Sequence, residues 1–160
     1  MGRVMNVKIE TVVEALEYPE DWECYLDRAT GQLVVITENE EPYLDRDGEV
    51  ALDEIDDLPQ WQRDSIANVR LALESADLVP VPSKFDLHEW EIMRSFSNSC
   101  PEPIRRDLLD AIHGRGAFRT FRRTVDRLGV REDWFAYRDE TVRRFAEDWL
   151  LENGFEVTEQ

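Results

Sequence analysis

Cysteine, lysine and long apolar runs are scarce in this chain of 160 residues. Its two cysteines, Cys24 and Cys100, lie 76 positions apart, which fits neither a zinc site nor a disulfide framework. No stretch approaches the roughly 18 consecutive apolar residues of a membrane-spanning helix, and no leader with a charged start and an apolar centre opens the chain. The sequence therefore predicts a protein of a reducing, cytoplasmic compartment with no membrane partner.

Basic residues are also in the minority, because 36 aspartates and glutamates stand against 19 lysines and arginines, for a formal net charge of −17. This balance opposes nonspecific binding to nucleic acid or to an anionic membrane over the whole surface. The excess is concentrated in residues 1–80, which hold 20 acidic and 6 basic side chains, whereas residues 81–160 hold 16 and 13. Acidity is thus a property of the first half.

Recognisable catalytic signatures are missing. His88-Glu89 is not followed by a second histidine at position 92, where the chain has isoleucine, so the zincin spacing fails. A Walker loop and a nucleophile elbow are absent, and no serine or cysteine is placed beside His113 in sequence as a nucleophile pair. We therefore predict no catalytic residue, no cofactor and no metal, and favour a non-enzyme. The alternative is an enzyme built from scattered residues around His88 and His113.

The first half combines helices with a hairpin. Apolar spacing predicts a helix at residues 5–18 and a second at 59–75. Two β-rich segments, 22–28 and 33–37, flank a four-residue turn and predict a β-hairpin. Residues 78–82 must be extended, either as an edge strand or as a connector, because Pro80 and Pro82 disfavour helix.

The second half reads as successive helices. Asp86 is a candidate N-cap, with Glu89 completing a capping box. The first predicted helix begins after Asp86 and ends before Pro101, the others cover residues 104–113, 117–128 and 132–152, and a short strand is expected at 155–157. We expect an α+β fold: an N-terminal helix and a small antiparallel sheet on the hairpin at about 22–37, packed by a mainly helical C-terminal half. One domain, 1–160, would comprise an acidic α+β half at about 1–82 and a helical half at about 83–155.

The most distinctive segment surrounds Gly114-Arg115-Gly116. Arg105–Arg127 contains seven arginines against three aspartates. In the helix that follows the glycines, Phe118, Phe121, Val125 and Leu128 share one stripe, and most arginines fall on the other side. Either this face binds an anion or an acidic partner, or the segment is a tight turn whose arginines pair with the chain's own carboxylates. The candidate residues are Gly114, Arg115, Gly116, Arg119, Arg122 and Arg123.

Two other segments invite a functional interpretation. Aromatic residues in the last helix recur at helical spacing among both arginines and acids, which indicates a buried face and a salt-paired surface rather than a base-stacking platform. In the acidic loop, residues 43–54 approach the spacing of a calcium-binding loop. However, Tyr43 cannot supply the first carboxylate, and a solvated turn at Asp47-Gly48 is favoured.

Several motifs together resemble the uncharacterised bacterial UPF0158 family. The resemblance runs from about residue 8 to 155, and its most specific part is the run Gly114–Arg119 with the downstream Trp134 and Trp149-Leu150. It implies a single intact domain and singles out Arg115 and Arg119. It supplies no catalytic residue, cofactor or substrate.

From these observations we expect a small, acidic, soluble binding or interaction module of the cytoplasm. An acidic N-terminal half would face basic partners, while the Arg115–Arg127 face either binds an acidic partner or is neutralised internally. The alternative function is binding of nucleic acid or of a phosphorylated ligand at the same face. A protein partner or a homo-oligomer would use any exposed members among four aromatic residues, most of which we expect to be buried: Trp61, Trp90, Phe96 and Trp149.

Overall fold

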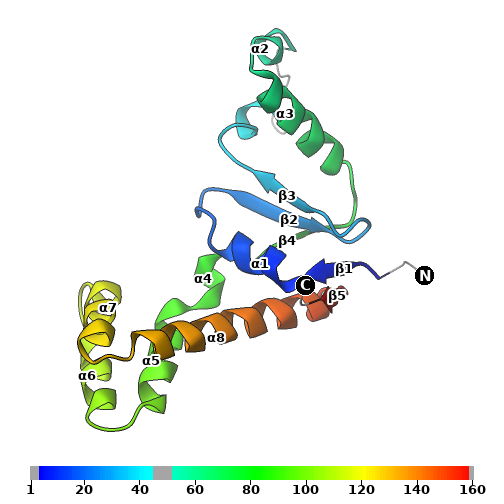
Figure 1. Cartoon of the computed structure of the whole chain (residues 1–160). Helices are drawn as coiled ribbons and strands as arrows, with labels where there is room; N and C mark the ends of the chain where they lie inside the picture. Colours follow the sequence, from blue (N-terminus) through cyan, green and yellow to red (C-terminus); the bar gives the residue numbers. More distant parts are fainter. Residues whose placement is uncertain (1–3, 45–51, 159–160) are drawn as a thin grey trace. The chain divides into compact units, whose positions relative to one another are not determined.

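The computed structural model describes residues 4–44 and 52–158, which form two compact units (Figure 1). Unit 1 runs to Ser83 and resumes at Asp148, and unit 2 comprises Lys84–Glu147. The fold class is α+β, with a small antiparallel sheet in unit 1 and a mainly helical C-terminal half, as the sequence predicts. Residues 148–158, which lie in the second half of the sequence, belong to unit 1.

The sheet of unit 1 has three antiparallel strands in the order β3-β2-β4. They are β2 (Glu23–Asp27), β3 (Leu33–Ile36) and β4 (Leu78–Pro80). The predicted hairpin is confirmed as β2 and β3, and the proline-rich extended segment is the edge strand β4. The turn is held by Asp27, whose carboxylate accepts the N–H of Ala29 at 2.9 Å. Gly31 occupies the left-handed region at φ +75°, a conformation that favours glycine.

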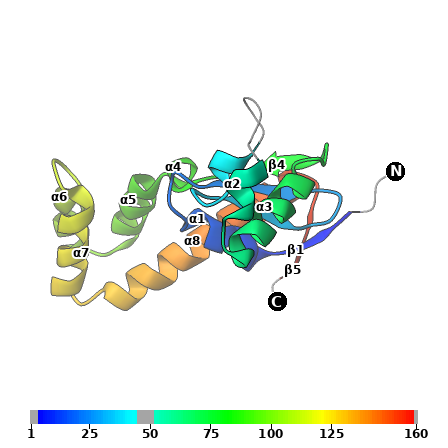
Figure 2. The ribbon, with the colours of Figure 1, turned by 90° about the horizontal axis from the view of Figure 1, so that it is seen from above.

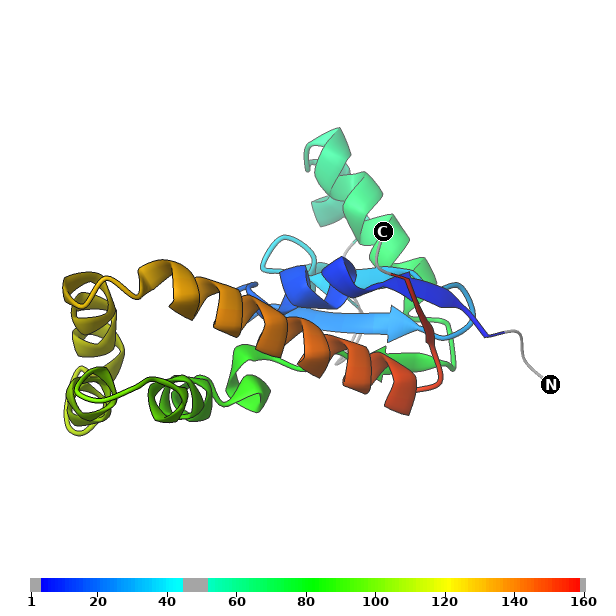
Figure 3. The ribbon, with the colours of Figure 1, turned by 60° about the horizontal axis from the view of Figure 1, so that its bottom comes forward.

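Both ends of the described chain meet in a second, parallel strand pair. Strand β1 (Asn6–Lys8) pairs with β5 (Glu156–Thr158), and the two run side by side in Figures 2 and 3. The predicted helix at 5–18 is therefore wrong at its start, because α1 covers only Ile9–Leu16. The partner of β1 lies about 150 residues away, so no local periodicity indicates the strand. The predicted short strand near residue 156 is confirmed.

Helix α3 (Gln60–Ala72) packs against strand β3. A core of Val34, Ile36, Leu44 and Val69 joins the helix to the strand. Two short helices, η1 (Glu41–Tyr43) and α2 (Leu52–Asp56), precede α3. The calcium-like segment at 43–54 lies mostly outside the described residues. Trp61, one of the four aromatic residues named as candidates for an exposed patch, is 60% exposed.

Five helices contribute to unit 2. They are α4 (Lys84–Leu87), α5 (Glu89–Ser99), α6 (Ile104–Ala111), α7 (Ala117–Arg127) and the first part of α8 (Arg131–Glu152). The helix predicted after Asp86 is broken at His88, which adopts a left-handed φ of 57°. Asp86 therefore lies inside α4 and does not cap α5, so the predicted capping box is wrong. His88 takes the cap position without a side-chain hydrogen bond.

An aromatic cluster forms the core of unit 2. Phe121 of α7 packs edge to face on Trp134 of α8 at a centroid distance of 4.9 Å. Phe96 of α5 lies 5.3 Å from Trp134 and 5.4 Å from Tyr137. The predicted buried face of α8 is confirmed at Trp134, whereas Phe135 is 53% exposed. One turn of α8 is thus fixed against both α5 and α7.

A forked ion pair joins α8 to α5. The Nε and Nη2 atoms of Arg138 donate to the two carboxylate oxygens of Glu89, with 3.2 Å between Nη2 and Oε2. About a quarter of each side chain is exposed (26% and 27%). The expected partners of Arg138 were acids of its own helix, whereas this contact crosses to another helix. Arg144 follows the expectation, pairing with Glu140 at 3.0 Å.

We predict that Arg138→Lys lowers the free energy of unfolding by about 1 kcal/mol, because lysine cannot form the two-pronged contact. Urea denaturation followed by circular dichroism measures the loss. The matched control is Arg144→Lys, whose pair is about 70% exposed and should change stability by only a few tenths of a kcal/mol. An equal loss of unfolding free energy in the two variants would show that the two-pronged contact of Arg138 is no more stabilising than the exposed pair of Arg144.

Candidate functional site

Two glycines shape the turn that leads into α7. Gly114 and Gly116 have φ values of +98° and +69°, which L-residues with a side chain rarely adopt. An added Cβ would meet no atom within 4 Å at either position, so backbone conformation and not crowding requires glycine. The end of α6 is held by the indole N–H of Trp90, which donates to the carbonyl of Ile112 at 3.0 Å. The turn therefore leaves α6 from a fixed point.

Helix α7 has one buried side and one charged side. Phe121 and Val125 are almost completely buried, and Thr124 is 7% exposed. The opposite side carries Arg119, Arg122 and Arg123, whose spacing of three and four residues places them on one face, and Arg115 lies in the turn just before the helix. We call four of these exposed side chains the arginine face: Arg115, Arg119, Arg122 and Arg123. Because its inner side packs into the aromatic cluster, α7 presents this face on a fixed support.

Within unit 2, all of whose residues the structure describes, no carboxylate pairs with the arginine face and no hydrogen bond reaches its guanidinium groups. The next arginine, Arg127, lies 3.9 Å from Asp107 of α6, and Asp126 lies 3.7 Å from Arg131. Within unit 2, internal neutralisation, the second sequence interpretation, therefore applies to Arg127, whereas the arginine face has no such pair there. The structure brings the six candidate residues together as one exposed turn and helix face.

Phe118 departs from the predicted stripe, because it is 53% exposed while Phe121 is buried. The core aromatics Phe96 and Trp134 pack on Phe121, and Phe118 lies one turn earlier. Phe118 and Arg122 are four residues apart, so the ring flanks the arginine face. The face consequently combines cations with one exposed aromatic surface.

The remaining sequence candidates do not gather into a reactive centre. His88 and His113 are both exposed. Burial raises the pKa of the thiols of Cys24 and Cys100, which keeps them protonated. Across residues 4–44 and 52–158, no cluster of three or more histidine, cysteine or carboxylate side chains is placed to hold a metal ion. Over the same residues, no helix combines the length and apolar character needed to cross a membrane.

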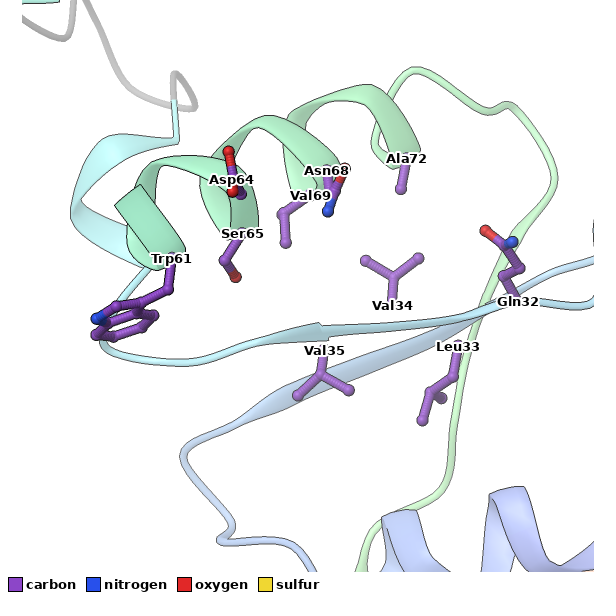
Figure 4. A pocket seen from close by; sticks show the side chains of 10 residues that line it. All are labelled: Gln32, Leu33, Val34, Val35, Trp61, Asp64, Ser65, Asn68, Val69 and Ala72. Atoms are coloured by element: carbon purple, nitrogen blue, oxygen red, sulfur yellow. The ribbon is translucent and has the colours of Figure 1, made fainter. Parts of the chain in front are cut away.

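Sequence reasoning missed a groove between β3 and α3, with a volume of about 480 Å³ (Figure 4). Trp61, Asp64 and Asn68 line it from α3, and Val34 lines it from β3. One signal was present in the sequence. Trp61 lies roughly 140° around the helix from Ile66, too far to share a single buried stripe. Its 60% exposure follows from this placement.

Comparison with protein families decides the affiliation. The model of an uncharacterised protein family, UPF0158, matches residues 3–160. The chain belongs to UPF0158. The match covers nearly the whole chain and confirms the resemblance carried by the glycine-arginine segment and the downstream tryptophans. No curated protein and no solved structure matches this UPF0158 chain. Both the arginine face and the β3–α3 groove lie within the matched range.

Proposed function

We propose that this UPF0158 protein is a cytoplasmic interaction module whose arginine face binds an acidic segment of a partner protein. One observation carries the proposal: four neighbouring guanidinium groups lack a carboxylate partner within unit 2, although that unit contains 12 acidic side chains. Like charges held together on one helix face repel one another, and a complementary anion removes that repulsion. The two free thiols support a reducing compartment.

Charge distribution favours a short acidic segment over a nucleic acid. The sequence of unit 1 holds 24 acidic and 6 basic residues, a formal charge of −18, whereas unit 2 holds 12 and 13, a charge of +1. A long polyanion experiences the repulsion of the whole molecule, while a short segment can remain within the face. The planar fork of arginine also matches a carboxylate in two-point contacts. Phe118, which flanks the face, provides an apolar contact for a leucine or a similar residue of the partner.

The test uses a fluorescein-labelled peptide of eight glutamates and two leucines, titrated with the full-length protein at low ionic strength. We expect Arg119→Ala combined with Arg122→Ala to weaken binding about five- to tenfold, because each exposed charge pair contributes up to about 1 kcal/mol. Fluorescence anisotropy measures the dissociation constant. Raising the salt concentration should weaken the binding of the peptide to the wild type. It should also reduce the difference in dissociation constant between the wild type and the double variant.

The matched control removes two arginines from elsewhere in unit 2. Arg94→Ala with Arg144→Ala makes the same change in net charge at exposed side chains that pair with their own carboxylates. We expect this variant to bind the peptide within twofold of wild type. Equal weakening by both double variants would overturn the site. Tighter binding of labelled DNA, RNA or a phosphorylated peptide, lost on changing Arg119 and Arg122, would replace the acidic protein segment with that ligand.

A further inference from the structure

Strand β3 has an open edge. Its partner β2 lies on one side, and no strand of the described chain lies on the other. The N–H of Asp27 donates to the carbonyl of Gln32 at 3.0 Å, and alternation along an antiparallel pair then directs Val34 and Ile36 toward β2. The main-chain groups of Leu33 and Val35 therefore face away from β2. Among residues 4–44 and 52–158, no hydrogen bond reaches them.

The sequence of β3 provides no protection for this edge. Proteins usually block an exposed edge strand with lysine, proline, an inward charge or a bulge, because unpaired N–H and C=O groups recruit another strand. Strand β3 reads Leu33-Val34-Val35-Ile36, which contains none of these devices. Its residues have high β-propensity and form an effective template for strand addition. An unprotected edge is expected in a protein that uses the edge to pair with a strand of another molecule.

The β3–α3 groove runs beside the same strand. In Figure 4 the side chain of Val34 points toward α3, where Val69 and Ala72 lie opposite, whereas Leu33 and Val35 point to the other side of the strand. A segment added next to β3 would place alternate side chains in the groove. In the groove, the side chains of the added segment would lie on apolar residues at the floor and beside the indole of Trp61 at one end.

The charge of the groove selects a cationic occupant. Among the described residues that line the groove, one side chain is charged, that of Asp64. Ser65, Asn68 and Gln32 add neutral polar groups. The two arginines of α3, Arg63 and Arg70, lie roughly 200° around the helix from Trp61 and Asn68 respectively, so they face away from the groove. Unit 1 as a whole carries −18. A basic segment therefore experiences attraction at the groove and at longer range.

We propose that the edge of β3 and the β3–α3 groove bind an extended basic segment of a partner protein as an added strand. Main-chain hydrogen bonds form with Leu33 and Val35, as in other cases of strand addition. Side chains that enter the groove are lysines or arginines, whose stems lie on Trp61 and whose charges approach Asp64. Residues on the opposite face are apolar and adjoin Leu33 and Val35. A second copy of this chain is disfavoured as the occupant, because it would bring another net charge of −17.

This surface is on unit 1 and is independent of the arginine face on unit 2. The test uses an acetylated, labelled octapeptide of alternating valine and lysine, titrated with the full chain. Val35→Pro removes the outward N–H without removing a ladder hydrogen bond to β2, a position where edge strands tolerate proline. We expect it to weaken binding at least tenfold, with circular dichroism confirming that the variant is folded. The matching octapeptide of valine and glutamate should not bind.

A second pair of variants gives an answer even if Val35→Pro does not fold. Trp61→Ala should weaken peptide binding about tenfold, as truncation of an aromatic anchor does. Its control is Leu71→Ala, an apolar residue of the same helix that is 69% exposed and does not line the groove, and it should leave affinity unchanged. Equal binding of the glutamate peptide, or binding unaffected by Trp61→Ala, would overturn the proposal. So would a dimer seen by light scattering that Val35→Pro dissociates, because a second copy would then occupy the edge.

Discussion

Phe121→Ala is expected to lower the free energy of unfolding by about 3–5 kcal/mol, the largest effect we predict for a single substitution. The ring is fully buried, contacts Trp134 edge to face at 4.9 Å and lies 6.5 Å from Phe96. Removing it deletes apolar contacts from three helices and leaves a cavity between them. Denaturant unfolding followed by tryptophan fluorescence reports the change directly, because Trp134 belongs to the same cluster.

The chain supplies a control for this experiment three residues away. Phe118→Ala removes the same ring from the same helix at a position that is 53% exposed, and we expect a loss below about 1 kcal/mol. The comparison separates burial from helix propensity, since both changes introduce alanine into α7. A similar loss in the two variants would show that the aromatic cluster does not support α7.

Glu40→Gln is expected to destabilise unit 1 by about 2 kcal/mol at neutral pH. Glu40 is buried, with 6% exposure. Its carboxylate accepts the N–H and the hydroxyl of Thr37 at 2.9 and 2.6 Å and, on the other oxygen, the hydroxyl of Ser65 in α3. The contact joins the end of β3 to α3 beside the groove. A glutamine keeps a carbonyl oxygen for Thr37 and can donate its amide N–H₂ to the Ser65 hydroxyl, but the hydrogen bonds to a charged carboxylate become weaker bonds to a neutral amide.

The pH dependence of this effect has a definite sign. Burial alone raises the pKa of Glu40, but hydrogen bonds from Ser65 and Thr37 lower it more, so the pKa in the folded protein is below the usual value. The carboxylate therefore stabilises the fold at neutral pH. Its contribution is lost as the pH falls below the usual glutamate value of about 4.3 toward the lowered value. The stability difference between wild type and Glu40→Gln should shrink over that range.

Urea titrations at neutral and acid pH measure this difference. Glu38→Gln is the matched control, because Glu38 is exposed two positions away and the same isosteric change there should alter stability little at either pH. A constant difference between wild type and Glu40→Gln across the acid range would contradict the assigned role. Ser65, which donates to Glu40, also lines the β3–α3 groove. The peptide titration described for Trp61→Ala, repeated with Glu40→Gln, therefore reports whether the loss of this contact alters the groove.

Local patterns predicted those elements whose determinants are close together in the chain. The hairpin was predictable because its turn residues and both strands lie between residues 22 and 37. Helices α3, α6, α7 and α8 followed from apolar spacing and from the glycines and prolines that end them. Strand β1 was not predictable, because it depends on β5 at the other end of the chain.

The candidate sites show the same division. Spacing placed the arginines on one side of α7, and the structure confirms that side as exposed. Spacing also placed Phe118 and Phe121 on one stripe, and only the positions of Phe96 and Trp134 distinguish the exposed ring from the buried one. Glu40 belongs to a loop rich in carboxylates, yet it is buried because Ser65 lies across from it.

The sequence by itself determined the α+β class, the uneven charge, the hairpin and the membership of UPF0158. Tertiary structure alone decided which arginines of unit 2 lack a carboxylate within that unit, which edge of the sheet has no partner strand among the described residues, and which aromatic residue lines the groove. The reason is physical. Secondary structure and net charge depend on neighbours within a few residues or on simple sums, whereas pairing and burial depend on side chains brought together from distant parts of the chain.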